Sequence, residues 1–322
     1  MELQQPFIRI PFAFDVKRLK LELAALEESC WMPHPSGMVG NTAVALVSKN
    51  GTDNNDFEGR MQPTKHLQQC EYIAQIMHDL DEVLGRSRLM RLDPGCEVSP
   101  HVDFNYHWYS RVRIHIPIVT DPAVMFHCGE EQVHMKAGEC WLFDSWRRHH
   151  VVNGSNIRRV HLVLDTAGSS RFWRLVHDVA KYGKEFEHPD LLAKLKTIAF
   201  QPGKKVAVMT EQYNSAPVMA PGEMEAMSKE LMADVRAYPK NDPAIVDEYA
   251  ILLNDLVKDW RELWHTFGMS EEGKKHYQNL LNKTVGKLRP DPRILLTSSN
   301  KIGIRPIIMQ RIIRAALYDD QA

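Results

Sequence analysis

The sequence predicts a mainly β core, arranged as a sandwich or barrel, with helices before and after it in the chain. Three observations lead to this fold class. Residues 86–165 form short runs of β-type residues, several of them strictly alternating, and turn dipeptides separate the runs. The first 90 residues mix short strands with helices. From about residue 170 onward, apolar residues recur at helical spacing.

The composition is that of an ordinary globular chain and limits the function classes. Of 322 residues, 44% are apolar and 25% are charged, and the formal net charge is −1. Such a balance argues against a protein that holds nucleic acid or a membrane surface by bulk charge. The five cysteines are widely spaced without a CxxC pair, which argues against a disulfide framework and a structural zinc site. We therefore expect a reducing, cytoplasmic compartment. No run long enough for a membrane span and no secretory signal is recognisable.

The N-terminal part is expected to contain two strands and two helices. A strand is predicted over 7–14, and a helix over 15–30 begins at Asp15. Another strand opens the stretch 42–55 and ends in a turn, and a second helix is predicted over 66–83. This part would flank the β core.

The middle of the chain is expected to supply the β core. Pro94-Gly95 interrupts its first strand, and Asn153-Gly154 ends a later one. Several short strands with such turn signals favour a sandwich or barrel over βαβ units. The predicted strands lie within 87–98, 111–119, 122–129, 132–144, 149–153 and 157–166.

The last part of the chain is expected to be helical, and its role is open. A Pro/Gly-rich stretch at 215–223 is typical of a linker. We divide the chain into a barrel domain, 1–200, and a helical region, 201–322. The region could cover the barrel mouth, build a homodimer interface, or bind a carrier or peptide substrate. Helices are predicted over 172–186, 188–200, 224–238, 245–267 and 271–285, with a basic helix in the last thirty residues.

Strand periodicity places polar side chains together on one face of the core. Residues two apart in a strand point to the same side. Arg113 and His115 therefore share a face, and Arg159 shares a face with His161. The opposite faces are apolar. A barrel whose mouth is lined by His, Asp and Arg is the simplest arrangement that accommodates this pattern.

Three residues have the types and spacing of metal ligands. His101 and Asp103 stand two apart, and His149 follows 48 residues after His101. Two histidines and one carboxylate on one face of an octahedron suit Fe(II) and leave positions for O2 and a co-substrate. At such sites the co-substrate is often 2-oxoglutarate, whose far carboxylate is best held by the fork of an arginine. Arg159 is the candidate.

Three segments of the middle region together resemble a known family. They are LDPGCEVSPHVD, RVRIHIPIV and AGECWLFDSWRRHHVVNGSNIRRVHLVLD, which span residues 92–103, 111–119 and 137–165. Their motifs and order resemble the aspartyl/asparaginyl β-hydroxylase branch of the Fe(II)/2-oxoglutarate dioxygenases, which includes bacterial hydroxylases of amino acids. The resemblance covers about residues 86–167. It implies a double-stranded β-helix, a jelly-roll barrel of the cupin type, with N-terminal helices and a C-terminal helical region in an overall α+β fold.

The resemblance also implies roles for individual residues. His101, Asp103 and His149 would be the iron ligands and the catalytic centre. Arg159 would hold the distal carboxylate of 2-oxoglutarate, and the R-x-H of Arg113 and His115 would help. The family pattern H-x-V-x-N fits a start at His149, because His150 would place Gly154 at its last position.

One departure within the family affects the substrate. Animal aspartyl hydroxylases have a non-ligating residue where this chain has Asp103, so Asp103 restores a full facial triad of the bacterial type. We therefore expect a small-molecule substrate, an amino acid or a derivative, with peptides and acyl chains still open. The expected reaction oxidises an unactivated C–H and releases succinate and CO2, with Fe(II), 2-oxoglutarate and O2, and with ascorbate as reductant in vitro. Hydroxylation and desaturation both remain open.

Two alternatives belong to other function classes. One is a metal- or ligand-binding cupin-like barrel without turnover. The other is a metalloenzyme that does not use 2-oxoglutarate. Such sites usually carry three or more histidines and no arginine dedicated to a co-substrate, whereas this chain has Asp103 and Arg159.

Overall fold

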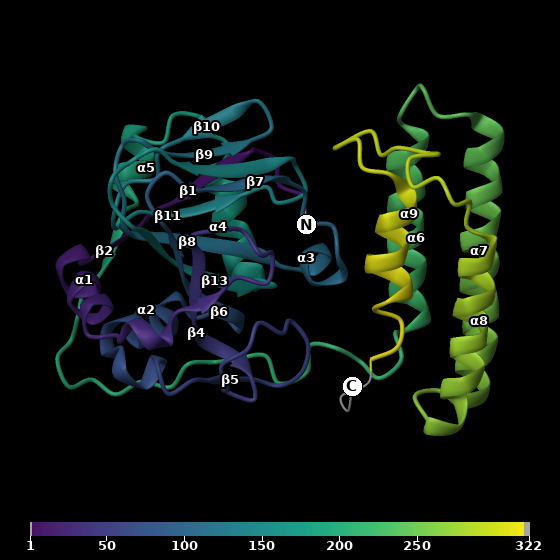
Figure 1. Cartoon of the computed structure of the whole chain (residues 1–322), viewed down its shortest axis with the longest axis horizontal. Helices are drawn as coiled ribbons and strands as arrows, with labels where there is room; N and C mark the ends of the chain where they lie inside the picture. Colours follow the sequence, from purple (N-terminus) through teal and green to yellow (C-terminus); the bar gives the residue numbers. More distant parts are fainter. Residues whose placement is uncertain (1, 319–322) are drawn as a thin grey trace. The chain divides into compact units, whose positions relative to one another are not determined.

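The computed structural model describes residues 2–318 and divides them into two compact units (Figure 1). The first unit comprises the residues up to His101 together with Ser110–Asn214. The second comprises the residues from Ser215 onward and an inserted segment, Val102–Tyr109. The division between 1–200 and 201–322 stays a prediction. Its outermost residues, 1 and 319–322, lie outside the described part of the chain.

Eight consecutive strands form the core of the first unit. One sheet contains the order β6-β13-β8-β11, and a second sheet has the order β10-β9-β12-β7, with all neighbours antiparallel. Successive strands cross from one sheet to the other, except β9 and β10, which form a hairpin. This order is that of the double-stranded β-helix, or jelly roll. The strands are β6 (Leu84–Leu92), β7 (Glu97–His101), β8 (Val112–Val119), β9 (Val124–Cys128), β10 (Glu131–Val133), β11 (Cys140–Phe143), β12 (His149–Asn153) and β13 (Arg159–Thr166).

The larger sheet is extended by strands from the N-terminal part. β1 (Phe7–Ile10) pairs with β11, and β4 (Asn41–Lys49) pairs with β6. β3 (Met32–Pro33) and β5 (Met61–Pro63) both pair with β4. These strands widen the sheet beyond the jelly roll. The sequence predicts strands as well as helices in this N-terminal part.

The two faces of the larger sheet have different partners. Ile114, Ile116 and Leu162 point to an outer core, which the helices α1 (Val16–Ala24), α2 (Glu71–Leu80) and α4 (Ser170–Ala180) cover. The inner face meets the smaller sheet, where rings of Phe126 and Phe143 lie 4.7 Å apart. Residues of opposite parity in β8 and β13 therefore face the interior between the sheets.

Three local predictions need correction. The strand predicted over 7–14 breaks into β1 and β2 (Phe12–Phe14) at Pro11, which has no N–H for a ladder. The helix predicted over 188–200 is a short helix, α5 (Pro189–Ala193), followed by β14 (Lys196–Ile198), which pairs in parallel with β2. The predicted linker at 215–223 includes the start of a helix, because Pro221 occupies the first turn of α6 (Pro221–Arg236).

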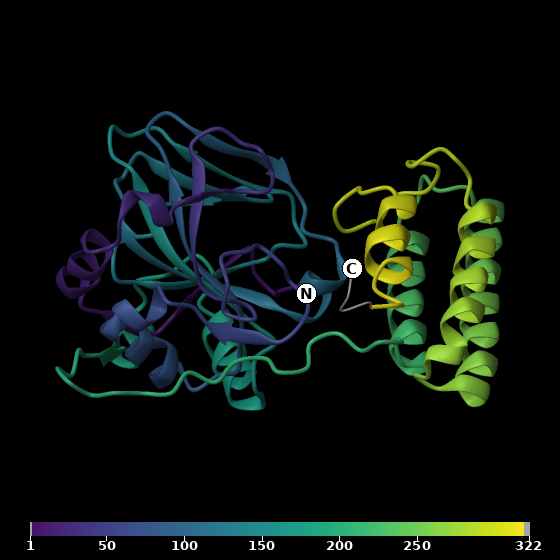
Figure 2. The same cartoon turned by 60° about the horizontal axis from the view of Figure 1, so that its bottom comes forward.

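The second unit is helical. α6 packs on α7 (Pro243–Phe267), and α7 packs on α8 (Lys274–Lys287); these helices are the green to yellow-green ribbons of Figure 2. The rings of Trp260 and Tyr277, both fully buried, lie 4.4 Å apart in its core. None of the helices in the described residues is both long and apolar enough to cross a membrane. The remaining helical elements are α3 (Tyr106–Ser110), α9 (Ile304–Ile307), a π-helical turn (Ile308–Ile313) and short 3-10 turns at Glu28–Cys30, Leu67–Gln69 and Glu271–Gly273.

Candidate active site

The three predicted metal ligands lie together where two strands of the smaller sheet meet. His101 ends β7 and stands opposite His149, which begins β12. Their ring centroids are 4.2 Å apart. Asp103 follows two residues later, and one ligand atom from each of the three side chains lies within 4.8 Å of the others. The group can therefore surround a single metal ion.

Backbone contacts fix the same tautomer in both histidines. The Nδ1 atom of His101 is 2.8 Å from the carbonyl oxygen of Ser99, and that of His149 is 2.9 Å from the carbonyl of Arg147. A carbonyl only accepts hydrogen bonds, so each Nδ1 carries the proton and donates it. Nε2 is then the nitrogen that would bind a metal, in the arrangement usual for metal-binding histidines.

His150 lies on the other side of the strand. It stacks on His127 of β9, with ring centroids 4.1 Å apart and planes within 4°. Because successive side chains of a strand alternate in direction, only His149 can join the metal group. The histidine that the structure places in the metal group is the one that the H-x-V-x-N pattern favours.

A buried aspartate shapes the turn before His149. Asp144 is fully buried and accepts hydrogen bonds from the backbone N–H of Trp146 at 3.0 Å and from Nε of Arg147 at 3.0 Å. Burial raises the pKa of Asp144, although these donors oppose the shift. These contacts hold the turn that positions the carbonyl oxygen of Arg147, which accepts the hydrogen bond from Nδ1 of His149.

A buried asparagine at the far end of β12 ties neighbouring segments together. The side-chain amide of Asn153 donates to the carbonyl oxygens of Leu92, Asp93 and Ile157, at distances between 2.9 and 3.0 Å. Its backbone N–H donates to Cys96 at the start of the β7 segment. Asn153 therefore fixes the strands that carry both histidines relative to the larger sheet.

Arg159 is a buried cation on the inner face of β13. Its side chain is 5% exposed, and Nη2 donates to Nδ1 of His161 at 2.8 Å. The same Nδ1 lies 3.4 Å from Nδ1 of His115 on β8. Burial lowers the pKa of Arg159 to about 9. The pKa of His161 is well below its usual range, first because the ring is buried and next because Arg159 is charged.

The arginine and its two histidines leave polar atoms without partners. Nε of Arg159, Nε2 of His115 and Nε2 of His161 are buried, and none has a hydrogen-bond partner among the described residues. No carboxylate in that part of the chain forms an ion pair with Arg159, although an uncompensated buried charge is strongly destabilising. The chemistry of this group fits a small anion with several acceptor oxygens.

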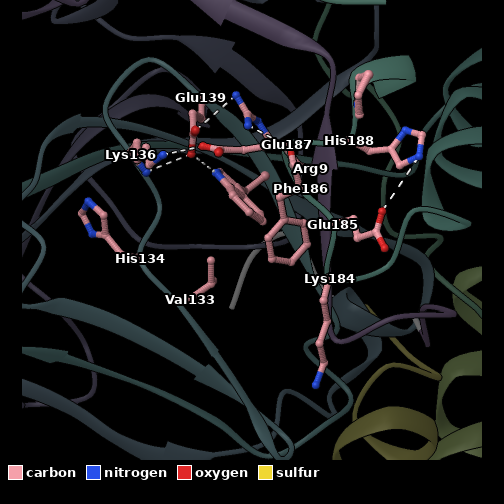
Figure 3. A pocket seen from close by; sticks show the side chains of 12 residues that line it. Arg9, Val133, His134, Lys136, Glu139, Lys184, Glu185, Phe186, Glu187 and His188 are labelled. Atoms are coloured by element: carbon pink, nitrogen blue, oxygen red, sulfur yellow. Dashed lines mark hydrogen bonds and ion pairs between the residues drawn. The ribbon is translucent and has the colours of Figure 1, made fainter. Parts of the chain in front are cut away.

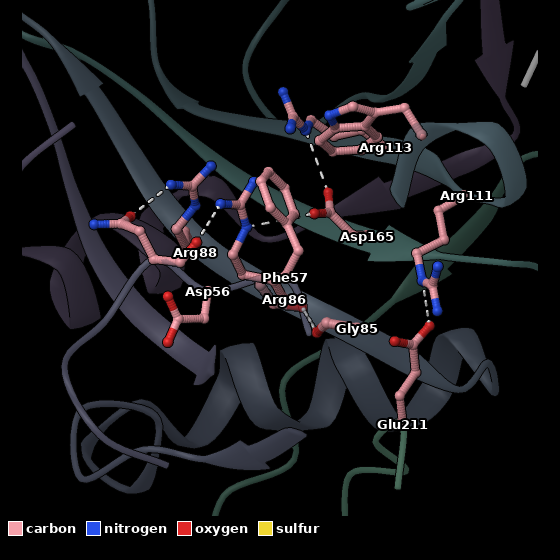
Figure 4. Close-up of polar contacts among 12 residues, drawn as sticks. Asp56, Phe57, Gly85, Arg86, Arg88, Arg111, Arg113, Asp165 and Glu211 are labelled. Atoms are coloured by element: carbon pink, nitrogen blue, oxygen red, sulfur yellow. Dashed lines mark hydrogen bonds and ion pairs between the residues drawn. The ribbon is translucent and has the colours of Figure 1, made fainter. Parts of the chain in front are cut away.

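A second cationic group lies further along the same inner face (Figure 4). Arg113 Nε is 3.2 Å from Asp165, and Arg86 Nε is 3.7 Å from the other oxygen of that carboxylate. Arg86 also packs over the ring of Phe57, and Arg88 donates to Asn55. We call Arg86, Arg88 and Arg113 the arginine cluster. Sequence reasoning did not identify Arg86 and Arg88, although their spacing of two in GRSRLMRL is a usable signal.

The six predicted site residues are therefore distributed over three neighbouring positions. His101, Asp103 and His149 form the metal group. His115 adjoins the Arg159–His161 pair, whereas Arg113 pairs with Asp165 at a register position two residues away in β8. The roles of Arg113 and His115 in co-substrate binding stay predictions.

A pocket of about 600 Å³ is separate from this site (Figure 3). Arg9, Glu139, Trp141 and the segment 184–189 line part of it, and none of the candidate ligands does. Its charged groups are already paired. Glu139 accepts from Arg9 at 3.1 Å and from Trp141 at 2.9 Å. We assign no ligand to this pocket.

A double-stranded β-helix with a His, Asp, His group is the arrangement that mononuclear non-haem Fe(II) oxygenases use. Residues 43–168 match the family model described as aspartyl/asparaginyl beta-hydroxylase. This stretch includes all the strands of the jelly roll and every candidate site residue. Residues 43–168, which are less than half of the chain, are therefore similar to the aspartyl/asparaginyl β-hydroxylase family.

Curated relatives match the same region. L-proline cis-3-hydroxylase 1 of a Streptomyces species is 33% identical over 124 residues, which are 36% of this chain and 42% of that protein. L-proline cis-3-hydroxylase 2, also from Streptomyces, is 31% identical over 121 residues, covering 34% of this chain and 40% of that protein. The match spans less than half the length of either relative.

Among solved structures, the similarity is distant. A prolyl hydroxylase of Trichoplax adhaerens, in complex with a peptide fragment of the hypoxia inducible factor oxygen degradation domain, has a TM-score of 0.37 and 12% identity, covering 51% of this chain and 84% of that chain. The fold assignment rests on the strand order of the two sheets.

Proposed function

We propose that this protein is an Fe(II)- and 2-oxoglutarate-dependent hydroxylase that oxidises an unactivated C–H of an amino acid, an amino-acid derivative or a peptide, and releases succinate and CO2. The observation that carries the proposal is the pairing of two features. A three-residue metal group lies at the ends of two strands, and a buried arginine without a carboxylate partner lies on the sheet that faces them. One without the other would have little specific meaning.

The metal group fits Fe(II). Two imidazole nitrogens and one carboxylate form the ligand set typical of non-haem Fe(II) oxygenases, and zinc or magnesium sites usually differ from it. His101 and His149 present Nε2 because their Nδ1 protons are held by backbone carbonyls. Asp103 supplies the negative charge.

Arg159 fits the distal carboxylate of 2-oxoglutarate. A guanidinium group binds a carboxylate through two parallel hydrogen bonds, and the bond is strongest where water is excluded. Nε of Arg159 and the Nε2 atoms of His115 and His161 are buried polar atoms without partners in the described chain, so a bound carboxylate would satisfy groups that are otherwise costly to bury.

The residues of the chain hold and orient the reactants, and they exclude water. Bound iron with 2-oxoglutarate supplies the O2 activation, which no side chain can provide. Arg159 holds the end of the co-substrate that does not react, while His115 and His161 remain neutral because burial and neighbouring cations lower the pKa of each ring. Phe143, whose ring lies 4.8 Å from that of His149, keeps the floor of the site apolar.

The arginine cluster supports a substrate with a carboxylate. The guanidinium groups of Arg86 and Arg113 lie beside Asp165 on the inner face of the larger sheet, and Arg88 donates to Asn55. An amino acid, a derivative or a peptide end carries a carboxylate that such a group would complement. The two Streptomyces relatives are proline hydroxylases by name, which also favours an amino acid.

Succinate formation from 2-oxoglutarate is the direct test of this function. The assay uses purified protein with added Fe(II) and ascorbate, first without substrate and then with a panel of amino acids. We expect succinate from the wild type and from His150→Ala, and none from His149→Ala or Arg159→Met. Metal binding without succinate would favour the barrel without turnover, and turnover independent of 2-oxoglutarate would favour another metalloenzyme.

A further inference from the structure

The segment that follows His101 belongs to the helical unit. Val102–Tyr109 clusters with the residues from Ser215 onward, although the strands on either side of it belong to the barrel. This segment carries Asp103, the carboxylate of the metal group. Asp103 therefore lies in the same unit as the C-terminal helices.

Arg311 contacts the backbone next to Asp103. It lies in the π-helical turn Ile308–Ile313, is 6% exposed, and donates from Nε to the carbonyl oxygen of Phe104 at 3.2 Å. Its guanidinium carbon is 5.2 Å from the centroid of the Tyr109 ring. One buried side chain thus touches both the start and the end of the segment.

Two further contacts hold the segment against α6. The hydroxyl of Tyr106 donates to Oε1 of Glu223 in the first turn of α6, at 2.6 Å. Tyr109 hydrogen-bonds Glu230 on the same helix. The residues 104, 106 and 109 are therefore each attached to the helical unit.

Asp103 has a different backbone setting from its two histidine partners. His101 and His149 are held by the ladder between β7 and β12 and by their backbone carbonyl acceptors. Asp103 lies beyond the end of β7, in an irregular stretch without ladder bonds. A ligand placed on a loop loses affinity unless the loop is ordered before the metal binds.

We propose that Arg311 and Glu223 are positioning residues for Asp103, so that the C-terminal helices order the carboxylate that completes the metal group. This inference rests on the metal site of the proposed function. It gives the helical region a role inside the metal site, through Phe104 and Tyr106, and predicts that substitutions far along the sequence change metal affinity.

Metal affinity, rather than turnover, is the measurement. Co(II) is titrated into metal-free full-length protein without oxygen, and both the dissociation constant and the visible spectrum are recorded. Arg311→Met should weaken binding by about 10-fold, since supporting contacts of metal ligands are typically worth 10- to 100-fold in affinity. Tyr106→Phe removes one hydroxyl and should weaken Co(II) binding by roughly 3- to 10-fold, as expected for the loss of one hydrogen bond of typical net strength. Arg311→Lys, which keeps a cation near Phe104, should restore part of the loss.

A double-mutant cycle separates positioning from general destabilisation. In an Asp103→Ala background, Arg311→Met and Tyr106→Phe should have no further effect on Co(II) affinity, because the residue they position is gone. Arg289→Met is the matched control, since Arg289, which follows α8, pairs with Glu248 of α7 in the same unit. It should leave affinity unchanged. Should Arg311→Met fail to fold, Tyr106→Phe alone decides.

The outcomes distinguish this inference from the proposed function. If Asp103→Ala weakens Co(II) binding while Arg311→Met and Tyr106→Phe do not, the positioning role is wrong and the metal site stands. Equal losses in the wild-type and Asp103→Ala backgrounds would likewise overturn the positioning role. If Asp103→Ala and His149→Ala both bind Co(II) as the wild type does, the metal site itself is wrong.

Discussion

Arg159 donates a hydrogen bond to Nδ1 of His161 across 2.8 Å, so the neighbour of a buried cation is a neutral ring rather than a carboxylate. Burying a charge without compensation costs free energy in the ligand-free protein. The same arrangement makes the site ready for an anion. Removing the charge of Arg159 should therefore raise the stability of the ligand-free protein and weaken the binding of the co-substrate.

Arg159→Met should stabilise the ligand-free protein and abolish its response to 2-oxoglutarate. We expect the free energy of unfolding to rise by about 1–3 kcal/mol, as when a buried charge gives way to an apolar side chain of similar volume. Urea denaturation measures the first effect, and the shift of melting temperature with 2-oxoglutarate measures the second. Arg158→Met is the control, because Arg158 is an exposed neighbour on the opposite face. A destabilised Arg159→Met would contradict the view that the guanidinium is an uncompensated charge in the ligand-free protein.

Removing His149 should abolish metal binding, and removing His150 should not. Only His149 has its ring in the metal group, while His150 stacks on His127. Anaerobic titration of His149→Ala and His150→Ala with Fe(II) or Co(II) compares two adjacent residues of the same type. Loss of binding in His150→Ala would mean that the parity of β12 is wrong.

Asn153→Ala should destabilise the protein more than a typical surface change. The substitution leaves three buried or part-buried carbonyl oxygens without their donor. We expect a loss of about 2–4 kcal/mol in the free energy of unfolding. Chemical denaturation provides the value, and Asn156→Ala, at an exposed position of the same loop, should cost little. Comparable costs for the two variants would contradict the role given to Asn153.

The ligand-free protein should lose stability as the pH falls below about 6.5. His161 has a pKa well below its usual value in the folded state, so the unfolded chain binds a proton first. Each such histidine contributes a slope of up to about 1.4 kcal/mol per pH unit between the two pKa values. Unfolding in urea at pH 5, 6 and 7 measures the slope, and His161→Gln should reduce it. An unchanged slope in His161→Gln would mean that other groups cause the pH dependence.

Strand alternation made much of the site predictable. Because the period of two is a local property, it separates Arg159 from Arg158 without knowledge of the fold. The H-x-V-x-N pattern of the resembling family favours His149 over His150. The structure places His101, Asp103 and His149 within reach of one ion.

Contacts between distant segments could not be predicted in this way. Nothing local in Tyr106 indicates that its hydroxyl reaches Glu223, more than a hundred residues later. The helix α3 is too short and aromatic for periodicity to reveal. Arg86 escaped notice because the strand was predicted to begin after it, while β6 begins at Leu84.

The most direct test of the central claim is an anaerobic titration of the Fe(II)-loaded protein with 2-oxoglutarate, followed by visible absorption. Our account predicts an absorption change that requires both Fe(II) and 2-oxoglutarate, is saturable in the wild type, and is lost in His149→Ala. In Arg159→Met it should need at least about 100-fold more 2-oxoglutarate, since a buried charge-assisted pair is worth about 3 kcal/mol or more. No change in the wild type, or the same affinity in Arg159→Met, would contradict the claim that iron and 2-oxoglutarate share this site.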